Sequence, residues 1–203
     1  MCSSDLPPDG YTLLAGATSI LAINPALYSK LDYDSLKDFA PVSQTVSMPQ
    51  LLVVHPSVKA TNLKELLALA KAKPGELNYS SSGTGSSSHL AMELLKYMTG
   101  INVVHVPFKG SGQAMPNLLA GQVQLVFDPM PSSLPHVKSG KARGLVTSTL
   151  QRSRGMPDLP TLHETILPGF DVAPWFGLSV TGGTPRPDRK STRLNSSHTD
   201  ISR

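Results

Sequence analysis

The chain has 203 residues, 39% of them hydrophobic and 16% charged, which allows one large or two small globular domains with a buried core. No apolar run approaches the ~18 residues that a membrane span needs, so no transmembrane segment is expected. The net charge of +4 is spread along the chain without a basic run and interleaved aromatic residues, which argues against nucleic-acid binding.

The chain begins with MCSSDL, residues 1–6, which lacks the basic start and the apolar stretch of a signal peptide. This segment is similar to non-biological flanking sequence, and we expect it to be foreign to the protein. A turn signal, Pro-Pro-Asp-Gly, follows at residues 7–10. The apolar run Tyr11–Ala17 after it predicts the first strand.

A strand and a helix are predicted next. The strand is Leu51–His55, which Pro56 stops. The helix begins with a capping-box pattern of Asn62 and Glu65 and ends at Pro74-Gly75. Its apolar residues recur at the i, i+3, i+4, i+7 spacing of one helix face: Leu63, Leu66, Leu67 and Ala70.

Strands and helices then alternate along the chain, which predicts an α/β fold with a mostly parallel sheet and helices on its faces. The predicted strands are residues 77–81, 103–108, 123–127, 142–149 and 175–180, and the predicted helices are residues 86–98, 113–120 and 133–138. After Pro187 the apolar periodicity stops. We expect residues 188–203 to be a foreign or disordered tail.

The segment Ser80–His89, between a predicted strand and a predicted helix, is the most informative motif. Its glycines let backbone N–H groups approach a ligand, and the start of a helix attracts an anion. It is not a Walker loop, because no Gly-Lys-Ser/Thr follows, and it is a poor Rossmann match, because Ser88 occupies the third glycine position. The alternative is a plain helix start that Ser86 caps.

A second loop, Phe108–Gly112, has the same order of strand end, glycines, hydroxyl and helix start. Open α/β sheets bind ligands where such loops follow the carboxyl ends of parallel strands. In this loop, Lys109 is interpreted as a solvated side chain. Asp128 closes the strand 123–127, where it serves either to receive a ligand's amino or hydroxyl group or to cap a turn.

Catalytic and metal-binding motifs are not found. No G-x-S-x-G elbow is present, the histidines are scattered, and no pair of carboxylates has a useful spacing. The single cysteine, Cys2, forms no internal disulfide, and no Cys/His cluster has zinc spacing. We therefore expect no enzyme, no cofactor and no metal.

Several of these segments occur together and in order over about Pro8–Pro187, and this ordered set resembles the solute receptors of tripartite tricarboxylate transporters, the Bug-type periplasmic receptors. The segments are PDGYTLL (8–14), INPALY (23–28), FAPVS (39–43), NYSSSGTGSSSHLAMEL (78–94), VHVPFKGSG (104–112), LLAGQVQLVFD (118–128), SLPHVKSGKARGL (133–145) and WFGL (175–178). Each one alone is weak, but the order is specific.

The resemblance implies a type II periplasmic-binding-protein fold, in which two α/β domains close on a ligand around a hinge. By analogy, residues 51–172 form one whole domain, and residues 7–50 and 173–187 form parts of the other, incomplete one. The resemblance also implies periplasmic localisation, although no signal peptide is present, and a truncated receptor.

The family's ligand contacts, carried over by position, are expected at Thr18, Ser19, Ser81, Gly85, Ser86, Ser87, Ser88, Gly110, Ser111 and Asp128. The implied function is capture of a small carboxylate and its delivery to membrane transporter subunits by a monomer. Two alternatives stay open. One is an α/β enzyme that binds a phosphate or another anion on Gly83–Ser88, and the other is a ligand sensor with the same fold.

Overall fold

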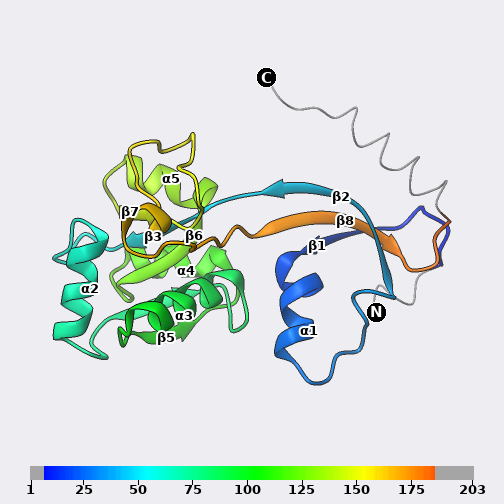
Figure 1. Ribbon diagram of the computed structural model, residues 1–203, viewed down its shortest axis with the longest axis horizontal. Coiled ribbons are helices and arrows are strands. Elements are labelled where there is room, and N and C mark those ends of the chain that lie inside the picture. The colour runs from blue at the N-terminus through cyan, green and yellow to red at the C-terminus, as the bar shows by residue number, and fades with distance from the viewer. Residues whose placement is uncertain (1–6, 186–203) are drawn as a thin grey trace. The chain divides into compact units, whose positions relative to one another are not determined.

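The computed structural model describes residues 7–185, which divide into two compact units (Figure 1). Unit 2 is Met48–Pro174, and unit 1 contains the described residues before and after it. The chain therefore leaves unit 1 once and returns to it once. The predicted foreign segments, residues 1–6 and 188–203, lie outside the described residues.

Unit 2 is built on a five-stranded sheet in the order β5-β4-β6-β3-β7. The strands are β3 (Gln50–Val54), β4 (Asn78–Ser81), β5 (Val104–Pro107), β6 (Leu125–Pro129) and β7 (Arg143–Thr147). β4 is parallel to β5 and β6, whereas β3 is antiparallel to both of its neighbours, β6 and β7. Four strands therefore share one direction, and the predicted mostly parallel sheet is confirmed in this unit.

The antiparallel direction of β3 follows from the path of the chain. It follows the strand Phe39–Ser47 of unit 1 after only two residues, Met48 and Pro49, and not after a crossover helix. It therefore enters the sheet from the carboxyl ends of the other strands. Its residues Leu51–Val54 are fully buried, as expected for a strand with neighbours on both sides and helices on both faces.

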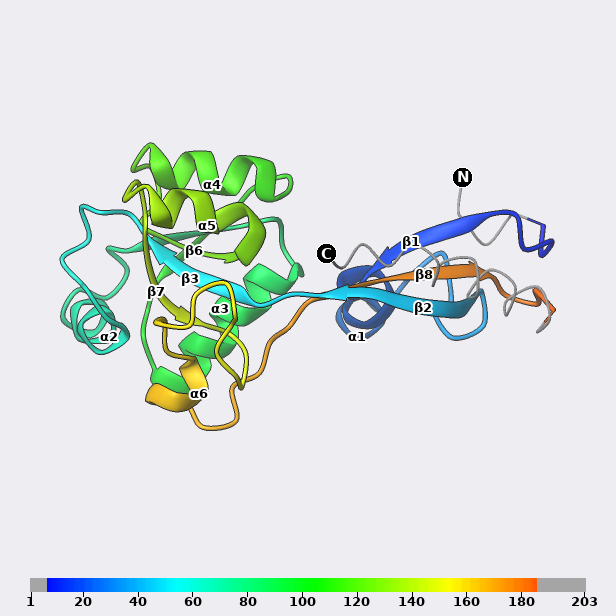
Figure 2. The same cartoon turned by 90° about the horizontal axis from the view of Figure 1, so that it is seen from above.

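Helices cover both faces of this sheet (Figure 2). The helices are α2 (Leu63–Ala72), α3 (Ser87–Thr99), α4 (Ser111–Leu119), α5 (Met130–Lys138) and the short α6 (Leu162–Thr165). α2 and α3 pack on one face, where Leu66 and Met92 join Leu52 in one apolar core. α4 and α5 pack on the other, where Leu118 and Met130 join a second core.

One edge of the sheet gathers the polar motifs. The carboxyl ends of β4, β5, β6 and β7 meet there, and β3 begins there, because Gln50 is in register with Pro129 and Leu51 with Thr147. The loops that lead into α3, α4 and α5 leave from this edge, which we call the ligand edge. Parallel α/β sheets bind their ligands at this position.

Unit 1 contains a three-stranded sheet in the order β1-β8-β2, with β1 (Leu13–Ala17), β2 (Phe39–Ser47) and β8 (Trp175–Thr181). A π-helical turn, η2 (Ser19–Ile23), and α1 (Asn24–Leu27) follow β1. Both pairs of strands are antiparallel, so the expected mostly parallel sheet is wrong for this unit. The reason is that β2 leaves the unit and β8 returns to it, so the two strands run in opposite directions.

The strand β2 is absent from the sequence-based prediction. It contains Pro41 and several polar residues, and its pairing with β8 shifts register twice. These irregularities remove the alternation by which a strand is recognised.

Among residues 7–185, no helix has the length and apolar content of a membrane span.

Candidate functional site

The loop between β4 and α3, Ser81–Ser88, is called the serine loop below. It turns through two glycines with positive φ, Gly83 at 128° and Gly85 at 78°, which side-chain-bearing residues rarely adopt. Ser86 caps α3: its Oγ accepts a hydrogen bond from the backbone N of His89 at 3.3 Å and donates one to Gly83 O at 2.6 Å. The predicted capping role of Ser86 is therefore confirmed.

Two hydroxyls of the serine loop are used to close the loop itself. Ser88 is buried, and its Oγ accepts a hydrogen bond from the backbone N of Ser82 at 3.0 Å and lies 3.0 Å from Ser86 Oγ. The backbone N–H groups of Ser87 and Ser88 belong to the first turn of α3, where no intrahelical partner exists. The donors that this loop can offer to an anion are therefore mainly N–H groups.

A second loop with the same construction is joined to the first. Gly110 donates its N–H to Ser82 O at 3.1 Å, and its φ of 96° turns the chain into α4, of which it is the N-cap. Ser111 begins α4 and is exposed. The starts of α3 and α4 thus lie side by side at the ligand edge, and each carries the partial positive charge of a helix N-terminus.

Two buried oxygens at the same edge lack a partner. Among the described residues, Gln50 Oε1 and Thr147 Oγ1 are the buried side-chain oxygens or nitrogens without a hydrogen bond. Gln50 begins β3, is 1% exposed and donates from Nε2 to Ser87 Oγ at 3.2 Å. Since buried polar groups are nearly always paired, such atoms mark a place where a partner is missing.

Sequence reasoning missed both Gln50 and Thr147. A signal for Gln50 exists, because it is a polar residue directly before the apolar run Leu51–Val54 in a central strand. Thr147 offers no such signal, since threonine is common in strands.

Asp128 is the penultimate residue of β6 and is almost fully buried. Its Oδ2 accepts hydrogen bonds from the hydroxyls of Ser132 and of Ser133, the latter at 2.8 Å, at the start of α5. Burial raises the pKa of Asp128, although the two hydroxyls and the nearby His136 lower it in part. The carboxylate thus has the geometry of a turn-capping aspartate at the ligand edge.

The two remaining predicted residues lie in unit 1. Thr18 precedes η2 and fixes the start of β8 through its hydroxyl, which accepts from Trp175 N at 2.7 Å and lies 2.9 Å from Trp175 O. Ser19 is the first residue of η2 and is half-buried. The structure therefore brings Ser81, Gly85–Ser88, Gly110, Ser111 and Asp128 to one edge of unit 2, and Thr18 and Ser19 to one turn of unit 1.

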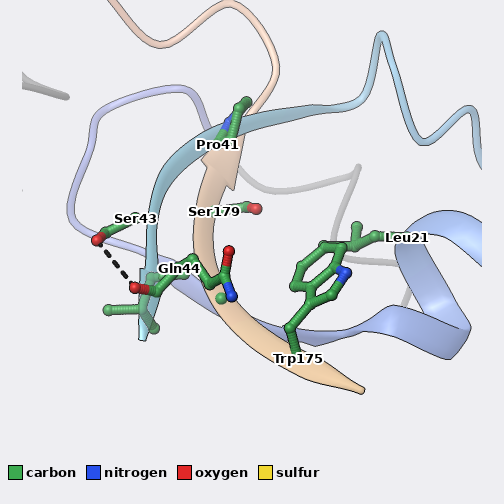
Figure 3. Close-up of a pocket in the computed structure, with 8 residues that line it drawn as sticks. Leu21, Pro41, Ser43, Gln44, Trp175 and Ser179 are labelled. Atoms are coloured by element: carbon green, nitrogen blue, oxygen red, sulfur yellow. Dashed lines mark hydrogen bonds between the residues drawn. The ribbon is translucent and has the colours of Figure 1, made fainter. Parts of the chain in front are cut away.

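Unit 1 also holds a small cavity of about 210 Å³. Trp175 and Leu21 face it, and the strand residues Pro41, Gln44 and Ser179 complete its wall (Figure 3). Its lining has no charged side chain.

One hydroxyl at this edge lies beside a histidine that the sequence does not place near it. Ser81 Oγ lies 2.6 Å from His105 Nε2, a distance typical of an activated nucleophile. Ser81 is fully buried, however, and its Oγ also accepts the N–H of Gly83 at 3.2 Å. This hydroxyl therefore supports the loop and is not open to a substrate.

In the part of the chain that the structure describes, no three His, Cys, Asp or Glu side chains are grouped to hold a metal ion.

An α/β unit whose parallel strands lead to two adjoining helix starts, in a chain that crosses between two units, is typical of solute-binding proteins such as the periplasmic binding protein BugD, to which this chain is 29% identical with a TM-score of 0.88. The match of a family model supports this class. The chain belongs to the tripartite tricarboxylate transporter family of receptors, whose model matches residues 3–200. This family consists of receptors and not of enzymes, in agreement with the class expected from the sequence.

Individual relatives agree with this assignment. Protein BugT of Bordetella pertussis is 38% identical over 177 residues, which are 87% of this chain and 54% of BugT. A structure from R. palustris with adipate has 37% identity and a TM-score of 0.89, over 96% of this chain and 64% of that one. MatC from Rhodopseudomonas palustris with bound malate has 31% identity and a TM-score of 0.87, over 98% and 68%. The chain spans about half the length of the curated relatives it matches.

Proposed function

We propose that the protein binds a small carboxylate at the ligand edge of unit 2 and delivers it to the membrane subunits of a tripartite transporter. The observation that carries the proposal is the convergence at one edge of two helix starts and the buried hydroxyl of Thr147, which has no partner and can donate to a carboxylate. The unpartnered Gln50 Oε1 at the same edge is an acceptor and would pair with water or with a hydroxyl of the ligand. Helix N-termini favour anions without a full positive charge. The neighbours with adipate and malate are consistent with this ligand class.

In the proposed site, the N–H groups of Ser87 and Ser88 at α3 and those of Ser111 and Gly112 at α4 receive one carboxylate, in part through ordered water. Ser81, Ser86 and Gly110 hold the loops in shape, and Asp128 fixes the start of α5. We propose Thr18 and Ser19 of unit 1 as further ligand contacts. A neutral anchor of this kind suits a receptor, because the ligand has to be released.

The proposal extends to location and assembly. A periplasmic location is supported by relatives described as periplasmic binding proteins, such as BugD at 29% identity. We propose that the protein acts there as a monomer, without a cofactor and without nucleic acid.

Calorimetric titration with adipate, malate and the uncharged diamide of adipate tests the proposal. Adipate or malate should bind and be recovered unchanged, and the diamide should bind at least about tenfold more weakly, since it lacks the charge that the helix starts attract. Equal affinity for adipate and for its diamide would contradict the proposal that the site recognises a negative charge. Conversion of a ligand to a new product would place the protein among enzymes, and tighter binding of inorganic phosphate would favour a phosphate-binding enzyme or sensor.

A further inference from the structure

Two histidines form a stack beside the serine loop that the proposed function does not use. His89 is the third residue of α3, and His105 lies on β5. Their ring centroids are 4.2 Å apart and the rings are inclined by 23°. Tyr79 of β4 extends the stack on the side of His105, at 4.8 Å.

Each histidine holds one part of the serine loop. The backbone N of Gly85 donates a hydrogen bond to His89 Nδ1 at 3.2 Å. His105 Nε2 lies 2.6 Å from Ser81 Oγ, and this oxygen accepts the N–H of Gly83 at 3.2 Å. The two imidazoles therefore fix both the beginning and the middle of the loop.

These contacts determine which protonation states fit the loop. Nδ1 of His89 accepts a hydrogen bond only when the ring is neutral and carries its proton on Nε2. A proton on Nδ1 would leave the N–H of Gly85, a buried residue, without its acceptor. His105 can keep its bond to Ser81 in either state, but two imidazolium rings at 4.2 Å would repel each other.

The surroundings favour the neutral pair. Burial is the largest cause that lowers the pKa of His89 and of His105. Glu93 of α3 opposes this effect, and Lys96 of α3 reinforces it. Tyr79 of β4 stays neutral, since burial and its hydrogen bond to Glu93 raise its pKa.

We propose that His89 and His105 are positioning residues for the serine loop, so that carboxylate binding at the ligand edge requires His89 to be neutral. This inference rests on the proposed carboxylate function and adds a regulation to it: the ligand binds in competition with a proton and is released when His89 becomes charged. A charged His89 would also attract a carboxylate, but water screens that attraction because outer residues of the loop, such as Thr84, are exposed.

The experiment uses two substitutions that keep the hydrogen bonds and remove the titration. His89→Asn places an amide oxygen near the position of Nδ1, and His105→Gln places an amide near the position of Nε2. His55→Asn is the matched control, because His55 follows the opposite end of β3 and contacts Ser57 instead of the serine loop.

Imidazole and amide NMR signals are first followed as the pH falls, which gives the midpoint of the His89 titration and checks that the protein stays folded. The amide signal of Gly85 should move with this midpoint. Adipate affinity is then measured near neutral pH and at about one pH unit below the midpoint, where full linkage lowers wild-type affinity about tenfold.

The His89→Asn variant should bind adipate as wild type does near neutral pH and about tenfold more tightly than wild type at the lower pH. His105→Gln and the control His55→Asn, which both keep His89, should bind as wild type does at both pH values. Wild type and variants are compared at the same pH, so the ionisation of adipate affects all of them equally. The proposal is overturned if His89→Asn loses affinity as wild type does, or if the Gly85 signal does not follow His89. If adipate binds at no pH, the proposed carboxylate function fails, and the Gly85 signal alone decides the positioning role.

Discussion

Replacing Ser87 with Asp should abolish carboxylate binding while leaving α3 folded. Ser87 is the first residue of α3, where a negative side chain stabilises a helix by about 0.3–1 kcal/mol. Gln50 Nε2, 3.2 Å from Ser87 Oγ, can donate to the new carboxylate. A bound carboxylate about 4 Å away would be repelled by about 4 kcal/mol at an effective dielectric constant of about 20. The affinity for adipate should therefore fall at least about a hundredfold.

Two variants control this experiment. Ser87→Asn has nearly the shape of Asp without its charge and should keep binding within about a few-fold of wild type. Asn62→Asp adds the same charge at the N-cap of α2, which follows the opposite end of β3, and should leave binding unchanged. Adipate binding by Ser87→Asp as tight as that of wild type would mean that the serine loop is only a helix cap.

Replacing Asp128 with Ala should lower the free energy of unfolding by about 1–3 kcal/mol, because the hydroxyls of Ser132 and Ser133 lose the carboxylate and keep only backbone carbonyls, such as that of Pro129, as acceptors. Replacing it with Asn keeps the shape and one acceptor oxygen, so most of the stability should remain. Chemical denaturation of the two variants measures the difference. A loss of equal size in both variants would mean that the charge, and not the hydrogen bonding, holds the start of α5.

The pH dependence of the Asn variant follows from the pKa of Asp128, which burial raises above its ordinary value of 3.8. In the window between these two pKa values the native state holds this proton more tightly than the unfolded state. The contribution of Asp128 to stability is therefore fully present below 3.8 and is lost as the pH rises through the native pKa. The free energy of unfolding of Asp128→Asn, relative to that of wild type, should therefore be higher near neutral pH than in acid. A difference that becomes more favourable to Asp128→Asn on acidification would contradict the shift.

Much of unit 2 follows from the sequence, because its signals are local. The helix spacing of Leu63, Leu66, Leu67 and Ala70 and the glycines at the loops predict α2 and the starts of α3 and α4, and the structure confirms these elements. The place of the polar loops at one edge also follows, since parallel strands bring their carboxyl ends together.

What the sequence could not predict depends on contacts between distant residues. Two contacts join β5 to the serine loop: the hydrogen bond between Ser81 and His105 and the stack of His105 on His89. No spacing of residues in the sequence predicts either contact. The antiparallel sheet of unit 1 pairs β1 and β2 with β8, a strand more than a hundred residues away. The unpaired oxygen of Gln50 appears only when the whole surroundings are known.

The most direct test of the carboxylate site is an NMR titration of the backbone amides with adipate. We predict the largest chemical-shift changes at the first turns of α3 and α4, where the N–H groups of Ser87, Ser88, Ser111 and Gly112 lie. The amides of Gly75, Gly121 and Gly140, which precede strands at the opposite edge of the sheet, should not move. Adipate binding that shifts these three glycines and leaves the two helix starts unchanged would contradict the assignment of the ligand edge.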